Sequence, residues 1–170
     1  MSNLVYYYNQ NATPPEETYI VDKNWVAVYG GIDPDTATPT ELAAAGFYAY
    51  TETAPPTYNE NIFTLDSQFV INGTDATLQY TTVDLPIEQS RRYYELQIAE
   101  TFASILRPTG TVIAEIRADS GTVPAALLTW RDDMATEALS KIATVAAAAD
   151  GTALETYIES AAYSTWPTQP

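Results

Sequence analysis

The stretch TPTELAAAGFYAYTETAPPTY, residues 38–58, has the pattern of a short capped helix followed by an aromatic strand. Thr38 suits the N-cap and Glu41 lies three residues later, which is the capping-box spacing that satisfies two backbone N–H groups of a first turn. Gly46 can adopt the left-handed conformation that ends a helix. Phe47 and the tyrosines after it favour a strand. The stretch therefore predicts a helix-turn-strand unit, which is typical of an α+β domain.

Around this unit, residues 1 to about 85 alternate short β-rich runs with turn residues. Asn72-Gly73 is a strong turn signal, although we expect the loop after it to extend to Thr77. The many tyrosines of this half suit antiparallel strands with one face in solvent. The strands that the pattern predicts span residues 4–8, 18–21, 25–29, 47–51, 62–65, 68–71 and 77–83.

Beyond residue 85 the spacing of apolar residues changes from two to about 3.6, which predicts helices. Pro86 suits the first turn of a helix running to about Leu106, because a first turn needs no backbone N–H. Arg107-Pro108 is expected to end this helix, since proline lacks the N–H that a helix interior requires. Residues 111–116 are compatible with a strand or with a continuation of the helix after a break, and of these readings we favour a loop of extended character. The apolar stripe of this helix comprises Ile87, Tyr94, Ile98, Phe102 and Ile105.

Two more helices are predicted after that loop. One spans residues 125–149, and in it Glu137 and Lys141 stand four residues apart as a favourable charge pair. After a break at Asp150, Thr152 and Glu155 predict a capping box for the last helix. The predicted fold is thus α+β, with an antiparallel β-rich acidic domain at residues 1–85 and a helical region at residues 86–170. The apolar side of the helix over 125–149 comprises Met134, Ala138, Ile142 and Val145.

The 170-residue chain contains neither cysteine nor histidine. This composition excludes disulfides, cysteine nucleophiles, Cys/His zinc sites and a Ser-His-Asp triad within the chain. Carboxylate, tyrosine or lysine chemistry remains open, but nothing in the sequence pairs two carboxylates for it. Asp33-Pro34-Asp35 lacks the glycine and the terminal glutamate of a calcium loop. We therefore expect no catalytic set, no cofactor and no metal.

The formal net charge of −15 is unevenly distributed along the chain. Up to residue 90 the only basic residue is Lys23, against twelve acidic residues, whereas six basic and ten acidic residues follow. Such a surface opposes binding to nucleic acid phosphates and to anionic membranes. No apolar run approaches the roughly 18 residues of a membrane helix, and the first residues do not resemble a secretory signal. We expect a protein made in the cytoplasm, with no nucleic acid partner and no membrane insertion.

Tyr6, Tyr7 and Tyr8 form the most conspicuous aromatic run of the sequence. On a strand, Tyr6 and Tyr8 share one face and Tyr7 takes the other. Packing within the sheet and a platform that contacts a sugar or a protein are both compatible with this arrangement.

In the helical half, aromatic residues are expected to make the main protein–protein contact while the acidic β half faces solvent. Tyr94 fits the apolar stripe, so its neighbour Tyr93 must project elsewhere. Trp166 lies beyond the last helix beside a proline that limits its freedom, so that burying it loses less entropy. The alternative for Trp166 is packing against its own core. The candidate contact residues of this half are Tyr93, Tyr94, Tyr157, Tyr163 and Trp166.

Three segments resemble small proteins of the tail-fibre-assembly type, which are encoded beside the tail-fibre genes of tailed bacteriophages. They are the stretch quoted above, FVINGTDATLQYTTVDLP at residues 69–86, and AAYSTWPTQP at residues 161–170. The resemblance implies a non-enzymatic tail protein that binds a tail-fibre or baseplate protein. It would act either as a transient fibre-assembly chaperone or as a permanent component of the virion tail.

Two other functions remain open from the sequence alone. A carbohydrate-binding module could use the tyrosines to hold host glycans, and a carboxylate-based glycosidase ranks below it. Helices with spare apolar faces are also compatible with a homo-oligomer.

Overall fold

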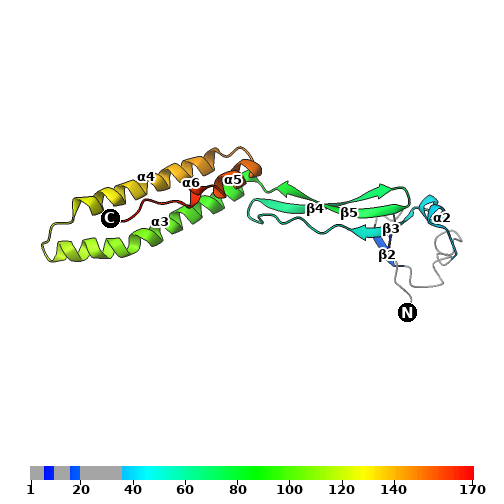
Figure 1. The fold of residues 1–170 in the computed structure, drawn as a ribbon, viewed down its shortest axis with the longest axis horizontal. Helices are drawn as coiled ribbons and strands as arrows, with labels where there is room; N and C mark the ends of the chain where they lie inside the picture. The colour runs from blue at the N-terminus through cyan, green and yellow to red at the C-terminus, as the bar shows by residue number, and fades with distance from the viewer. Residues whose placement is uncertain (1–5, 10–15, 20–35) are drawn as a thin grey trace. The chain divides into compact units, whose positions relative to one another are not determined.

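The computed structural model describes residues 6–9, 16–19 and 36–170, with side chains from Thr36 onward (Figure 1). Two compact units are present. The sheet unit comprises Met1–Thr57 and Leu65–Thr82, and the helical unit comprises Tyr58–Thr64 and Val83–Pro170. The α+β prediction, with a β-rich part followed by a helical part, is confirmed.

The described strands form one five-stranded sheet in the order β2-β1-β3-β5-β4. β1 pairs antiparallel with β2 and with β3, as predicted, whereas β3 pairs parallel with β5. In the sequence, β4 lies between β3 and β5 and runs in the opposite direction to both. β3 and β5 therefore run in the same direction, and the sheet is mixed. The strands are β1 Tyr6–Asn9, β2 Glu16–Tyr19, β3 Phe47–Glu52, β4 Phe63–Asn72 and β5 Asp75–Asp84.

Two expectations for the β4–β5 region are wrong. The separate strands predicted at 62–65 and 68–71 are one continuous strand, β4. The long loop expected up to Thr77 is a two-residue turn at Gly73-Thr74, after which β5 begins at Asp75. Gly73 has φ of +66°, a left-handed conformation that glycine adopts without steric cost and that tight hairpins require. The strand predicted at 25–29 lies outside the described residues.

The helix-turn-strand unit forms as predicted. α2 spans Pro39–Ala44, and its capping box is complete. The backbone N–H of Thr38 donates to Glu41 Oε2 (2.8 Å), and hydrogen bonding to Thr38 lowers the pKa of the Glu41 carboxyl. Gly46 has φ of +91° and turns the chain into β3. Leu42 and Phe47 are buried, so the turn fixes one apolar residue of the helix and one of the strand inside the sheet unit.

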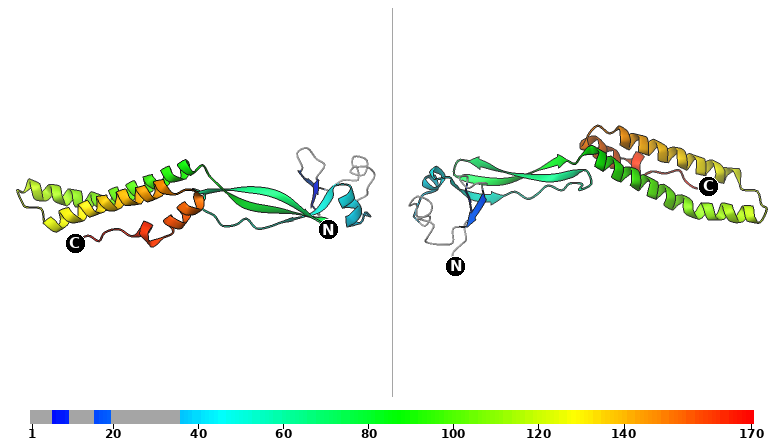
Figure 2. Two further views of the ribbon diagram at one scale, coloured as in Figure 1. Left: turned by 90° about the horizontal axis from the view of Figure 1, so that it is seen from above. Right: turned by 180° about the vertical axis from the view of Figure 1, so that it is seen from behind.

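The helical unit is built on a hairpin of two long helices, α3 (Ile87–Ala118) and α4 (Ala125–Ala147). Two short helices follow, α5 (Gly151–Ile158) and α6 (Ala161–Ser164). Figure 2 (left) shows α5, α6 and the chain end along one face of the α3–α4 hairpin. The buried core of this unit comprises Ile62, Phe63, Tyr94, Ile98, Ala138, Val145, Ala148 and Leu154.

The start of α5 depends on two carboxylates that the sequence did not point to. Asp150 is the N-cap and accepts a hydrogen bond from the Ala153 N–H (2.8 Å), so the capping box predicted at Thr152 is wrong. Asp84 accepts from the Gly151 N–H (3.0 Å). A Cβ on Gly151 would lie 2.9 Å from Ile62 Cγ2, closer than packed carbon atoms approach, so glycine is required here.

α3 continues through Pro108, so the expected helix end at Arg107 and the extended loop over residues 111–116 are both wrong. A proline inside a helix costs about 3 kcal/mol because one hydrogen bond is lost and the ring crowds the preceding turn. Beyond the proline, Thr109 and Ile113 are buried where α3 packs against α4. Burying one side chain such as isoleucine contributes about 1.5–3 kcal/mol. Tertiary packing therefore offsets the local penalty.

Replacing Pro108 with alanine is expected to raise the free energy of unfolding by about 1–2 kcal/mol, because alanine restores the missing N–H donor. Pro108 is exposed, so no packing is lost. Urea denaturation followed by tryptophan fluorescence measures the change. Pro124→Ala is the matched control, since Pro124 precedes the first turn of α4 and should gain far less. Unchanged or lowered stability in Pro108→Ala would contradict this account.

Candidate functional site

The C-terminal segment, residues 161–170, lies against the α3–α4 hairpin and is held by two side chains of α4. The Trp130 indole Nε1 donates to the Pro167 carbonyl (3.0 Å), and the Lys141 ammonium donates to the Ala162 carbonyl. Trp166 packs against the core of the helical unit. The C-terminal segment is therefore held through two of its backbone carbonyls, which accept hydrogen bonds from side chains of α4.

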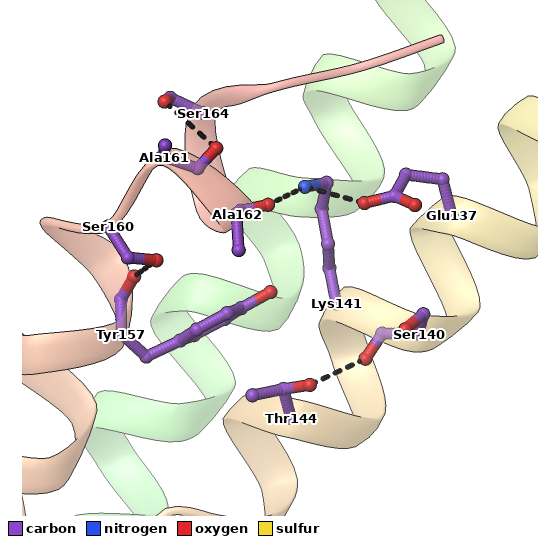
Figure 3. A network of polar contacts seen from close by, with 9 residues as sticks. All are labelled: Glu137, Ser140, Lys141, Thr144, Tyr157, Ser160, Ala161, Ala162 and Ser164. Carbon is purple, nitrogen blue, oxygen red and sulfur yellow. Dashed lines mark hydrogen bonds and ion pairs between the residues drawn. The ribbon is translucent and has the colours of Figure 1, made fainter.

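Lys141 is the central polar residue of this site (Figure 3). Its side chain is 1% exposed, and its Nζ lies 2.9 Å from Glu137 Oε1 one turn earlier on α4. The same nitrogen is 5.1 Å from the centroid of the Trp166 ring, within the range of a cation–π interaction. A buried ammonium is tolerated only when it is paired and hydrogen-bonded. Glu137, Ala162 and Trp166 together provide that pairing.

Four tyrosines, of which Tyr163 belongs to the C-terminal segment, form a continuous aromatic cluster. Tyr94 contacts Tyr93 edge-on with a centroid distance of 5.0 Å, and contacts Tyr163 at 6.1 Å. Tyr157 contacts Tyr163 at 5.7 Å. These T-shaped pairs join α3, α5 and α6, and such pairs add about 0.5–1.5 kcal/mol each beyond area burial. The cluster therefore fixes α5 and α6 on α3.

Burial raises the pKa of three of these phenols, Tyr94, Tyr157 and Tyr163. For Tyr94, the hydrogen bond from Asn59 Nδ2 (2.8 Å) opposes the rise only in part. Desolvation penalises the phenolate because a charge in an apolar cluster loses its hydration. The three side chains are therefore neutral at physiological pH and act as packing and hydrogen-bonding groups.

We expect the helical unit to lose stability as the pH rises above about 10. Each of the three phenols has a folded pKa above its ordinary value of 10.0. Their contribution to stability is complete below that ordinary value and is lost as the pH rises through the folded pKa, because only the unfolded chain ionises freely. Tyrosinate absorbance during an alkaline titration, recorded with circular dichroism, measures both events. Ionisation of all tyrosines near pH 10 in a still-folded protein would contradict the prediction.

The structure brings together the candidate contact residues predicted in the helical half but leaves them unequally accessible. Tyr93 is 40% exposed and Tyr94 only 7%, so the prediction that the two project differently is confirmed. Tyr157, Tyr163 and Trp166 are half-buried against the core. Trp166 thus folds back onto its own unit, which is the alternative that the sequence left open. Tyr6, Tyr7 and Tyr8 lie on β1, and their side chains are outside the described part.

Sequence reasoning missed the central roles of Lys141 and Trp130. The buried row of α4 comprises Trp130, Met134, Ala138, Lys141 and Val145, at spacings of four, four, three and four. Lys141 occupies an apolar position of that row, whereas the predicted stripe used Ile142, which is half-buried. A lysine at the spacing of a buried row was the available signal. The predicted Glu137–Lys141 pair is confirmed.

The described residues around the C-terminal segment offer hydrogen-bonding, charged and aromatic groups. Among residues 36–170, no three carboxylates lie close enough together to hold a metal ion. An open depression of about 440 Å³ beside the C-terminal segment is lined by Glu137, Ala161, Ala162, Thr165, Trp166, Pro167 and Thr168. In the part of the chain that the structure describes, no helix has the length and apolar character needed to cross a membrane. No protein-family model, curated protein sequence or solved structure matches this chain.

Proposed function

We propose that the protein is a bacteriophage tail protein that binds a tail-fibre or baseplate protein and has no catalytic activity. It serves either as a component of the virion tail or as a fibre-assembly chaperone made in the host cytoplasm. The observation that carries the proposal is the C-terminal segment. Its sequence, AAYSTWPTQP, carries part of the resemblance to tail-fibre-assembly proteins, and it presents half-buried aromatic residues at the surface of the helical unit.

The contact surface that supports the proposal is formed by Tyr93, Tyr163 and Trp166. Tyr93 is 40% exposed, and the other two retain part of their surface while packing on the core. Large aromatic residues that are already held in place bind with little loss of side-chain entropy and frequently anchor interfaces. The Lys141 and Trp130 bonds hold the C-terminal segment in position, so the surface is ordered before a partner arrives.

The test is binding of the purified full chain to the tail-fibre and baseplate proteins encoded beside its gene, measured by biolayer interferometry. Tyr93→Ala should weaken binding by about fivefold or more, since loss of an aromatic anchor costs more than about 1 kcal/mol. Val70→Ala, which also changes an exposed apolar residue (37% exposed) but lies in β4, should leave binding unchanged. Circular dichroism must show that both variants are folded.

Truncation after Tyr163 examines the C-terminal segment itself. Lost binding in a truncated chain that remains folded supports the proposal, whereas unchanged affinity overturns the role of Trp166. Mass spectrometry of purified virions then separates a permanent tail component from a chaperone that leaves. If neither neighbouring protein binds and a glycan array gives a specific signal, the protein is a carbohydrate-binding module instead.

A further inference from the structure

The α3–α4 hairpin carries a second set of apolar residues, of which Ile142 borders the core cluster and the others lie outside it. Leu96 is 56% exposed on α3 and Leu139 is 68% exposed on α4. Each belongs to a row that repeats every three or four residues, and every member is exposed or half-buried. We call the two rows together the open face. It comprises Leu96, Ala99, Ala103, Leu106, Gly110 and Ala114 of α3, and Leu128, Ala135, Leu139, Ile142 and Ala146 of α4.

Helix geometry places both rows on the side of the hairpin opposite to the C-terminal segment. One residue advances an α-helix by about 100°. On α3, Ala103 therefore points away from Tyr94, which contacts Tyr163 of α6. On α4, Leu139 and Lys141 turn to opposite sides of buried Ala138, and Lys141 bonds to α6. Because the two helices run antiparallel, rotations of similar size and sense along each chain bring both rows to one side of the hairpin. Figure 2 (left) shows α5, α6 and the chain end on the other side.

The charges of the hairpin permit self-association although the whole chain carries −15. Between residues 87 and 147 there are six basic and eight acidic residues, a net charge of −2. Near the turn of the hairpin, exposed Arg107 and Arg117 border the α3 row, and Asp132 interrupts the α4 row. Within residues 36–170, Asp132 forms an ion pair with its exposed neighbour Arg131 (2.9 Å), and such surface pairs are weak. A basic border on one helix and an acid on the other complement each other between two copies.

We infer that the open face binds a second copy of this chain, with two hairpins forming a four-helix bundle about a two-fold axis parallel to the helices. In that arrangement α3 of each copy lies against α4 of the other, and the Arg107–Arg117 border meets Asp132. Each helix of such a bundle needs two adjacent apolar rows, one for each neighbour, which is what α3 and α4 possess. An isologous contact of this kind also closes, so it yields a dimer and not a filament.

The size of the face suits a stable dimer. From Arg92 to Arg117 the hairpin is about 39 Å long at 1.5 Å per residue, and two helices side by side are about 20 Å wide. This footprint is close to the roughly 800 Å² per partner of a standard interface. Asp132 within the apolar row would fix the register, as single polar residues do in coiled coils. The inference does not depend on the proposed tail function, because the bundle uses neither Trp166 nor the aromatic cluster.

Sedimentation equilibrium of the full chain provides the first test. The mass should be twice the 18.6 kDa of one chain. Leu139→Glu should weaken dimerisation by about 30-fold or more, the effect of losing a central contact. Val112→Glu is the matched control, because Val112 is also an exposed residue of α3 (46%) but points away from the open face. A monomeric native chain, or a dimer that Leu139→Glu leaves unchanged, would overturn the inference.

Charge reversal and labelling keep the test independent of any folding defect. Asp132→Arg should weaken the dimer, and Arg107→Asp combined with Arg117→Asp in the same chain should restore it. Since the chain has no cysteine, Leu139→Cys introduces a unique thiol. Its reaction with a maleimide should slow as protein concentration rises through the dimerisation range, whereas a Val112→Cys thiol should react equally at all concentrations. Equal behaviour of the two thiols would count against the open face as the interface.

Discussion

Replacing Lys141 with alanine is expected to lower the free energy of unfolding of the helical unit by about 3 kcal/mol, the low end of what removing one partner of a buried ion pair costs. The low end applies because the Glu137 side chain is 38% exposed and remains partly hydrated. The Ala162 carbonyl also loses its donor, and Trp166 loses the cation over its ring. The C-terminal segment should consequently be released from α4.

Thermal and urea denaturation measure this loss, with Trp25→Phe as the background so that fluorescence reports Trp130 and Trp166 alone. Lys141→Met is the informative companion, because methionine keeps most of the apolar volume and loses only the polar contacts. It should cost less than alanine, since apolar replacement of a buried charge is frequently tolerated. Glu137→Gln should cost least, because an amide oxygen can still accept from the ammonium. Equal stability of all three variants and the native chain would contradict the central role of Lys141.

Replacing Leu154 with alanine is expected to lower the free energy of unfolding by about 3 kcal/mol, through lost burial and the cavity left behind. Leu154 on α5 is fully buried in the core cluster with Ile62 and Ile98. The same denaturation experiments measure the effect. Thr152→Ala is the control on the same helix, because Thr152 is exposed and surface changes usually stay within about 0.5 kcal/mol. If Leu154→Ala is as stable as Thr152→Ala, α5 does not close the core as described.

The two substitutions also distinguish the packing of α5 in the core from the attachment of the C-terminal segment, which carries Trp166, to α4. Leu154→Ala should loosen α5 and with it Tyr157, while Lys141→Ala should act on the segment that carries Trp166. If that segment holds a fibre or baseplate partner, Lys141→Ala should weaken binding at temperatures well below its unfolding transition. Binding that is unchanged in folded Lys141→Ala would show that the partner does not need the segment to be held on α4.

Local sequence signals were sufficient where the deciding interactions are local. The capping box of Thr38 and Glu41, the left-handed Gly46 and the start of α3 after Pro86 were all predicted, because each depends on residues within one turn. The stripe through Tyr94 and the opposite projection of Tyr93 follow from helix periodicity alone. Composition alone excludes whole classes of chemistry, because the chain has neither cysteine nor histidine.

The tertiary structure decided the features that depend on residues distant in sequence. Pro108 stays inside α3 because burial of Ile113 against α4 offsets the local cost of the proline. The parallel pairing of β3 with β5 results from how the chain returns through β4. The pairing of Lys141 with Glu137 is local and was predicted, whereas its contacts with the Ala162 carbonyl and the Trp166 ring exist only because α6 and the segment after it fold over α4. Such a site arises from long-range packing, whose free energy no local pattern contains.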